Sequence, residues 1–232
     1  MIDLRPLATL GQADRGWLKT KHHFSFARYV DPARSGWGDL TVWNDDEIAP
    51  GAGFAPHPHA DMEIVTFVRE GAVTHEDSLG NRGRIPAGDV QVMSAGTGVR
   101  HAEYNLETGP TKLFQIWIRP ERSGGEPAWG SKPFPKDDRA GHWVALASGF
   151  AGDAEALPIR ARARVLGAAL KAGEVLDYAL DAGRHGYLVP ASGAVTINGI
   201  FVNAGDGAAL QDEAVLRIAA RTDAEIVLVD AA

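Results

Sequence analysis

The sequence has no cysteine among its 232 residues, so disulfides, thiolate nucleophiles and sulfur ligands are excluded. Any metal ion must therefore be held by nitrogen and oxygen atoms. The chain also lacks a basic surplus, because its formal net charge is −7, which argues against a general phosphate-binding surface. No segment approaches the ~18 apolar residues of a membrane-spanning helix, and the start, Met-Ile-Asp-Leu-Arg-Pro, is a poor signal peptide. We therefore expect a cytoplasmic protein that contacts neither a membrane nor nucleic acid directly.

Short apolar segments separated by turn residues dominate the first half of the chain. Residues 63–69, 72–75 and 89–93 are rich in β-branched side chains, and glycine, proline, serine and asparagine interrupt them. No helical period runs through this region. With 45% hydrophobic residues the chain can bury a sizeable core. This pattern predicts an all-β protein built on a compact antiparallel barrel.

Four candidate metal ligands lie at the two ends of this region as two pairs. His57 and His59 form the first pair, and His101 and Glu103 form the second. Side chains two residues apart leave the same face of a β-strand, so two neighbouring strands would present three imidazoles and a carboxylate to one point. Such a donor set suits a divalent first-row metal ion.

Two further segments carry residues whose role the sequence leaves open. In the predicted strand 114–118, Gln115 and Trp117 share one face, so they either border a bound ligand or pack in an ordinary core. His22 and His23 are adjacent and therefore point to opposite faces of a strand, which favours packing or hydrogen bonding over metal binding.

The second half of the chain repeats features of the first. Gly71-Ala-Val-Thr recurs as Gly193-Ala-Val-Thr, and Ala-Gly88-Asp recurs as Ala-Gly205-Asp, in the same order. We therefore predict two tandem barrels, with residues 1–125 as the first, 126–140 as a linker rich in proline and glycine, and 141–232 as the second. Strand exchange between the halves would make their limits in space differ from these limits in sequence.

The repeat also allows the metal ligands to be sought in the second half. Counting from Gly193 and Gly205, the positions that correspond to the four candidate ligands are occupied by Ala179, Asp181, Ile218 and Ala220. None of these forms a comparable donor set. The second barrel is thus predicted to be degenerate and to have no metal.

The motifs around the two pairs resemble those of a known family. Gly51, His57-x-His59, Glu63 and Gly71 resemble the first cupin motif. A second set resembles the second cupin motif, with Ser94 where proline is usual. It consists of Gly88, Ser94, Gly96, His101 and Asn105. More narrowly, the chain resembles the pirin family of bicupins, above all the bacterial pirin-like quercetin 2,3-dioxygenases. Trp17, His23-Phe-Ser-Phe-Ala27, Asp77-Ser-Leu-Gly-Asn81 and Ala95-Gly-Thr-Gly-Val-Arg-His-Ala-Glu103 add to this resemblance, which covers about half of the chain and weakens after about residue 125.

This resemblance implies two cupin barrels and favours one ligand set. The spacing from Glu63 to Gly71 is one residue longer than the general cupin pattern, and one step along a strand turns a side chain to the other face. The pirin arrangement therefore implies His57, His59, His101 and Glu103 as the ligands, with Glu63 as the alternative carboxylate. It implies one divalent ion, Fe(II) in the first place, with Ni, Co, Cu, Mn or Zn as alternatives.

The resemblance also implies an activity. A flavonol such as quercetin and O2 would be the substrates of a metal-dependent quercetin 2,3-dioxygenase, which releases CO and a depside, with Glu103 taking the proton of the 3-hydroxyl. Members of the pirin family also imply an alternative, namely a metal-dependent redox sensor or transcription-cofactor binding protein without enzymatic turnover. Whether there is a protein partner is left open.

Overall fold

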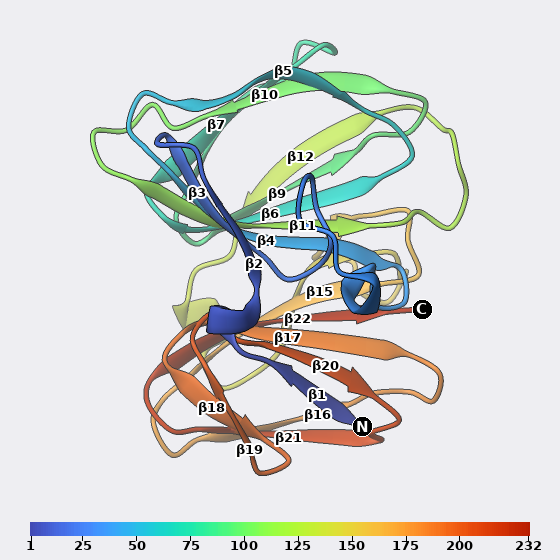
Figure 1. The fold of residues 1–232 in the computed structure, drawn as a ribbon. Helices are drawn as coiled ribbons and strands as arrows, with labels where there is room; N and C mark the ends of the chain where they lie inside the picture. The colour runs from blue at the N-terminus through green and yellow to red at the C-terminus, as the bar shows by residue number, and fades with distance from the viewer.

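The structure is a computed structural model that describes residues 1–232, and it consists of two antiparallel β-barrels stacked on each other (Figure 1). The first barrel is built from eleven strands. These are β2 (Gly11–Asp14), β3 (Leu18–His22), β4 (Leu40–Ile48), β5 (Gly53–His59), β6 (Glu63–Glu70), β7 (Ala72–Asp77), β8 (Arg82–Pro86), β9 (Asp89–Ser94), β10 (Val99–Tyr104), β11 (Thr111–Ile118) and β12 (Ala128–Pro133). A seven-stranded sheet in the order β12-β9-β6-β11-β4-β3-β2 faces a four-stranded sheet in the order β5-β10-β7-β8.

The second barrel has the same design. Its strands are β1 (Ile2–Arg5), β13 (Val144–Ser148), β14 (Leu157–Pro158), β15 (Arg164–Leu170), β16 (Val175–Ala179), β17 (His185–Ser192), β18 (Ala194–Ile197), β19 (Ile200–Asn203), β20 (Gly207–Gln211), β21 (Val215–Ala220) and β22 (Ala224–Ala231). Their orders are β1-β20-β17-β22-β15-β13-β14 and β16-β21-β18-β19. The predicted all-β fold with two tandem barrels is confirmed.

Only three short 3-10 helices interrupt the strands, and none of them is long and apolar enough to cross a membrane. They are η1 (Leu7–Thr9), η2 (Pro32–Arg34) and η3 (Asp137–Arg139).

Two strands belong to a different part of the fold from the one that their place in the sequence suggests. β1 lies within the predicted first domain, yet it pairs with β20 of the second barrel, with Ile2 opposite Leu210. β12 lies within the predicted linker, yet it pairs with β9 along its whole length. β12 and β1 occupy equivalent edges of the two large sheets. In space, β1 is therefore part of the second barrel although it precedes the first barrel in the sequence. The proline and glycine in residues 126–140 do not prevent an edge strand there.

The largest apolar cluster lies between the barrels and not inside either one. Side chains such as Trp43, Phe67 and Phe114 from the first large sheet pack with Tyr187 and Val227 from the second, because the two sheets lie face to face in the middle of the molecule (Figure 1). Complete burial of such a side chain contributes about 1.5–3 kcal/mol. This shared core joins the barrels into one unit.

The interiors of the two barrels differ in chemistry. A cluster of 16 buried apolar residues fills the second barrel. In the first barrel, two smaller clusters of 6 and 4 residues flank a polar interior that includes Thr66, His75, Gln91, Glu103 and Gln115. In the first barrel, buried polar groups thus occupy the middle of the interior, whereas apolar side chains occupy it in the second.

Candidate metal centre

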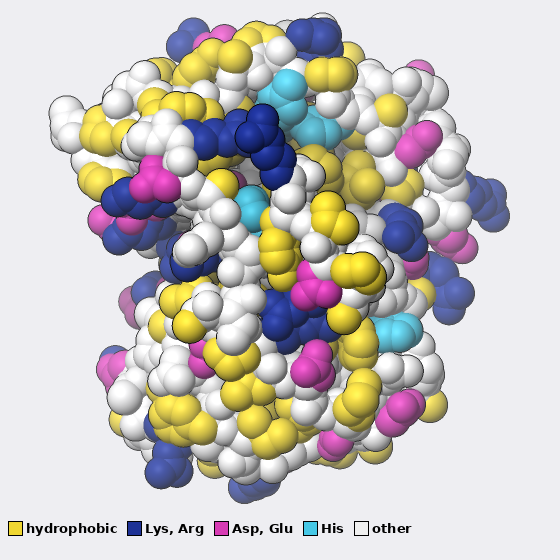
Figure 2. Space-filling view, viewed as in Figure 1, with side chains coloured by type: hydrophobic (Ala, Val, Ile, Leu, Met, Phe, Trp, Pro, Cys, Tyr) yellow, Lys and Arg dark blue, Asp and Glu magenta, His cyan; other side chains and the backbone are white.

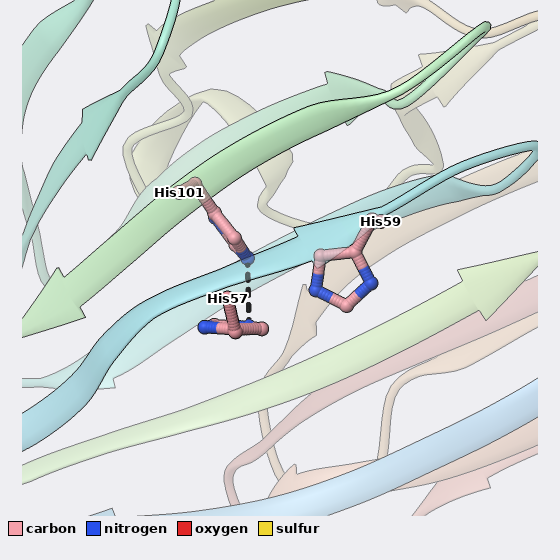
Figure 3. Close-up of side chains that lie close together, drawn as sticks. All are labelled: His57, His59 and His101. Carbon is pink, nitrogen blue, oxygen red and sulfur yellow. Dashed lines mark hydrogen bonds between the residues drawn. The ribbon is translucent and has the colours of Figure 1, made fainter.

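Three histidines converge on one point in the first barrel, and two adjacent strands position them. β5 carries His57 and His59, and β10 carries His101 directly opposite His57 in an antiparallel pairing. The i, i+2 spacing on β5 sends both of its imidazoles to the side on which His101 also lies (Figure 3). One ring nitrogen from each of the three residues lies within 4.8 Å of the others.

A hydrogen bond on the far side of the His57 ring orients its free nitrogen toward this point. His57 Nδ1 lies 2.8 Å from the carbonyl oxygen of Ala55 and can only donate to it. The Nε2 atom of His57 therefore keeps its lone pair, and it lies 3.1 Å from Nε2 of His101 (Figure 3). Two nitrogens that would each bind at 2.0–2.1 Å can share one ion only if they lie less than about 4 Å apart, and this spacing meets that condition.

Burial keeps the imidazoles of His59 and His101 neutral. Burial, together with the charge of His57, lowers the pKa of His59 to about 4. Burial, followed by the charges of the neighbouring histidines, lowers the pKa of His101 to about 2. Neutral imidazole is the form that binds metals, so these two side chains are available as ligands at neutral pH.

Glu103 is held beside the histidines by two glutamines. Gln91 Nε2 donates to Oε1 and Gln115 Nε2 donates to Oε2, each at 2.6 Å. The amides are oriented in turn by tryptophans, because the indole N–H of Trp129 donates to Gln91 Oε1 and that of Trp117 donates to Gln115 Oε1. This chain of donors fixes the carboxylate in one place.

The ionised form of Glu103 would be stabilised by a bound cation. Burial, followed by the charge of Asp46, raises the pKa of Glu103 to about 7. A carboxylate oxygen of Glu103 and ring nitrogens of His75 and His101 lie within 4.8 Å of one another, so His101 joins this group to the three histidines. A buried carboxylate next to neutral imidazoles is stabilised by a cation, so the donor set fits a divalent metal ion with nitrogen and oxygen ligands.

The alternative carboxylate, Glu63, lies elsewhere. Glu63 is buried on β6 on the same side of the strand as Val65 and Phe67, which belong to the core between the barrels. Its Oε2 atom accepts a hydrogen bond of 2.5 Å from the hydroxyl of Ser94. Thr66, an odd number of residues away, faces the barrel interior and reaches Gln91. The extra residue before Gly71 thus places Glu63 away from the histidines.

A cavity of about 570 Å³ opens beside the three histidines and Glu103. This volume lies in the range of small-molecule sites, about 300–1,000 Å³. Its aromatic lining comprises Phe26, Tyr29, Phe54 and Trp117. Gln115 and Trp117 therefore do border the cavity. Arg15 and Arg28 also line it, and basic side chains lie next to histidines on the front of the upper barrel in Figure 2.

Sequence patterns did not predict a role for the polar pair on β7 that lies beside this site. His75 and Asp77 on β7 are a further i, i+2 pair, and His75 Nδ1 lies 3.5 Å from His101 Nδ1. Their spacing was the available signal, because it matches that of the two ligand pairs. His22 lines the cavity and pairs with Asn44 at 2.8 Å, whereas His23 is buried on the other side and pairs with Tyr187.

The second barrel has no equivalent site, although the counted positions need a correction. Ile218 pairs with Ile197, which corresponds to His75, so Ile218 corresponds to Glu103 and not to His101. Leu216 then takes the place of His101. Both side chains are fully buried in the apolar cluster of that barrel. Counting along the chain failed here because the connection that leads into β21 differs in length from the one that leads into β10.

The fold and the site define a two-barrel cupin protein with a candidate metal centre in its first barrel. Residues 4–118 match the family model "Pirin", and residues 145–231 match the "Quercetinase C-terminal cupin domain". A "Pirin-like protein" from Caulobacter vibrioides is 67% identical over 100% of both chains. A "Quercetin 2,3-dioxygenase" from Escherichia coli is 43% identical over 99% of this chain and 98% of its own.

The solved structures agree with these relatives. The crystal structure of the bacterial pirin YhhW from Escherichia coli in complex with nickel(II) has a TM-score of 0.94 at 41% identity, and the match covers 100% of this chain and 99% of that one. The chain belongs to the pirin family.

Proposed function

We propose that the protein is a metal-dependent dioxygenase that cleaves a flavonol such as quercetin, with His57, His59, His101 and Glu103 as the metal ligands. The observation that carries this proposal is the convergence of three imidazoles, next to a buried carboxylate, on a cavity with an aromatic lining. A cavity beside the donors leaves room for substrate at the ion, which distinguishes a catalytic metal site from a closed structural one. Names of relatives, including the quercetin 2,3-dioxygenase from Escherichia coli, support the same class of reaction.

The reaction would consume one flavonol and one O2. The bonds C2–C3 and C3–C4 break, C3 leaves as CO, and both oxygen atoms of O2 remain in the depside. When bound, a divalent ion, for which we propose Fe(II), would lower the pKa of the 3-hydroxyl and orient the substrate.

Residues of the chain would accept the proton, hold the proton acceptor in position and contact the substrate. Glu103 would accept the 3-hydroxyl proton at a carboxylate oxygen, because its carboxylate lies beside His101 at the edge of the cavity. Gln91 and Gln115 would keep it in position through their amide donors. Trp117, whose ring meets that of His59 edge-on at 4.9 Å, would form a wall against the flat substrate.

The test is oxygen uptake by purified protein loaded with Fe(II) or Ni(II), with quercetin as substrate and CO and depside as measured products. His57→Ala and His101→Ala should lose metal and activity together. Glu103→Gln keeps the shape and one of the two glutamine contacts, because only its amide oxygen can accept a hydrogen bond. It should lower kcat by about a hundredfold or more, as expected for the loss of a general base, and thermal unfolding reports whether the fold is retained.

His142→Ala is the matched control, because His142 is exposed and lies in the second half of the chain. It should leave metal content and oxygen uptake unchanged. Metal-loaded protein that consumes no oxygen with any flavonol would contradict the proposal and would favour the alternative of a metal-dependent sensor or binding protein.

A further inference from the structure

The cavity has a second polar region that the proposed reaction leaves unused. Thr20 on β3 and Asp46 on β4 both line the cavity, on the large sheet that faces the β5-β10 sheet across the barrel. Their Cα atoms are direct partners in the antiparallel pairing of these strands, so their side chains leave the same face. Asp46 is 2% exposed and Thr20 is 6% exposed.

No protein group outside this pair satisfies it. The Thr20 hydroxyl lies close enough to Asp46 to act on its carboxyl, but no other residue forms a hydrogen bond with Asp46 Oδ1 or Thr20 Oγ1. The other polar groups of the cavity differ in this respect, since Glu103 receives two amide donors and the nearby His22 is paired with Asn44. Burial of a carboxylate with no donor other than one hydroxyl is costly, and native proteins leave few such groups. A ligand that brings a hydroxyl group to Asp46 would account for both unpaired oxygens.

The aromatic lining indicates what carries that hydroxyl. The ring of His22 lies 5.3 Å from that of Phe26 and stacks on Tyr29 at 6.4 Å. Phe26 in turn meets Trp117 edge-on at 5.5 Å. Aromatic faces thus run from the histidine site along the cavity wall toward β3 and β4, which suits a flat ring system with a hydroxyl at its end.

We propose that Asp46, assisted by Thr20, binds a phenolic hydroxyl other than the 3-hydroxyl and thereby selects polyhydroxylated flavonols over flavonols with the 3-hydroxyl alone. This inference rests on the proposed function, because it places the reacting ring at the three histidines. Asp46 accepts the hydroxyl proton in a hydrogen bond, and no covalent bond changes there. A hydrogen bond to a charged acceptor supplies roughly tenfold or more in affinity.

The experiment compares the binding of quercetin and of 3-hydroxyflavone to metal-loaded protein at pH 8 and without oxygen, by quenching of tryptophan fluorescence. At this pH the Asp46 carboxyl, whose pKa burial raises to about 7, is ionised. Asp46→Asn removes the charged acceptor at constant shape, and Thr20→Val removes the hydroxyl. Glu47→Gln is the matched control, because Glu47 is the next residue on β4, faces the other side and pairs with Lys19. Thermal unfolding of each variant reports whether the fold is retained.

Asp46→Asn should weaken quercetin binding roughly tenfold, leave 3-hydroxyflavone binding unchanged, and so remove the preference for quercetin. Thr20→Val should act in the same direction, and Glu47→Gln should change neither affinity. Equal effects on both ligands, no effect on either, or a wild-type protein that binds neither flavonol would each overturn the proposal. Selective binding without oxygen uptake would contradict the proposed reaction but support this subsite.

Discussion

Individual side chains behind His101 form a hydrogen-bonded chain that leads away from the cavity. Asp77 lies 3.3 Å from Nε2 of His75, and Nδ1 of His75 lies 3.5 Å from Nδ1 of His101. Asp77 is itself held by backbone N–H groups of Leu79 and Asn81. If His75 donates to Asp77, its Nδ1 atom accepts from His101, whose Nε2 atom then keeps the lone pair that a metal needs.

This chain predicts that His75→Phe weakens metal binding. Phenylalanine keeps a flat ring against Trp129, on which His75 stacks at 4.9 Å, but it accepts no hydrogen bond from His101. Loss of such an outer partner lowers metal affinity by roughly 10–100-fold. Chelator competition against the wild type measures the change, with His142→Ala as the control. Unchanged affinity in a folded His75→Phe protein would show that His101 needs no such partner.

The buried carboxyl group of Asp46 predicts how the stability of metal-free protein depends on pH. Burial raises the pKa of Asp46 from 3.8 to about 7, so folded protein binds a proton there that unfolded protein releases. This group therefore stabilises the fold most below pH ~4, and its contribution is lost as the pH rises to about 7.

Relative to the wild type, Asp46→Asn should gain stability across the same interval, by more than about 1 kcal/mol at pH 8. Urea unfolding at pH 4, 6 and 8 measures this difference. A difference that shrinks toward pH 8 would contradict the raised pKa.

Sequence spacing predicted more of the site than of its surroundings. The sequence was enough to recognise four candidate ligands, because the two members of each pair are two residues apart on one predicted strand. These are His57 with His59, and His101 with Glu103. Asp46 and Thr20 are single residues that become neighbours only through the pairing of β3 with β4. A pairing of distant strands leaves no local signal, so neither residue could be recognised in advance.

For two strands, the sequence likewise did not predict the partner with which they pair. The tandem repeat predicted both barrels, but β1 and β12 were assigned by their place in the chain. β12 is short and contains glycine and proline, which resembles a linker, yet Trp129 from this strand donates to Gln91 and stacks on His75. A strand at the edge of a sheet tolerates such composition because only one of its sides is paired.

The exchange of β1 predicts that a change in the first residues weakens the second barrel. Leu4 packs against the apolar cluster of that barrel, so Leu4→Ala should cost about 1–2 kcal/mol, less than for a fully buried leucine. Arg221→Gln, at an exposed position of the second barrel, should have little effect. Urea unfolding measures both variants, and equal stability of Leu4→Ala and wild type would mean that β1 contributes nothing to the barrel.

The molecule as a whole is joined by its central core and by one buried ion pair. Arg139 is fully buried, lies 5.5 Å from the ring of Phe67 in the first barrel, and donates to Glu225 of β22 at 2.8 Å. Lys136 also reaches Glu225, at 2.7 Å. Since the largest apolar cluster contains residues of both barrels, neither barrel can unfold without exposing the core of the other.

We therefore expect a single unfolding transition, in which fluorescence and circular dichroism coincide. Glu225→Leu should lower the free energy of unfolding by about 3 kcal/mol, because it leaves the Arg139 charge buried without a partner. The double variant Arg139→Met with Glu225→Leu should recover most of this loss. Arg217→Gln, which removes an exposed ion pair, is the control. Two separate transitions in the wild type would show that the barrels fold independently.

The partner of β1 has a consequence for synthesis of the chain on the ribosome. β1 is translated before the strands of the first barrel, but its partner β20 extends to Gln211, whereas β12, the last strand of the first barrel, ends at Pro133. At about 5–20 residues per second, roughly 4–16 s separate the two points. During that interval the amino-terminal segment waits next to a finished barrel with its backbone groups open to solvent. During this interval, a folded domain fused next to β1 could bind the unpaired strand before β20 is available. We therefore expect a carboxyl-terminal tag to give more correctly folded protein than an amino-terminal fusion domain.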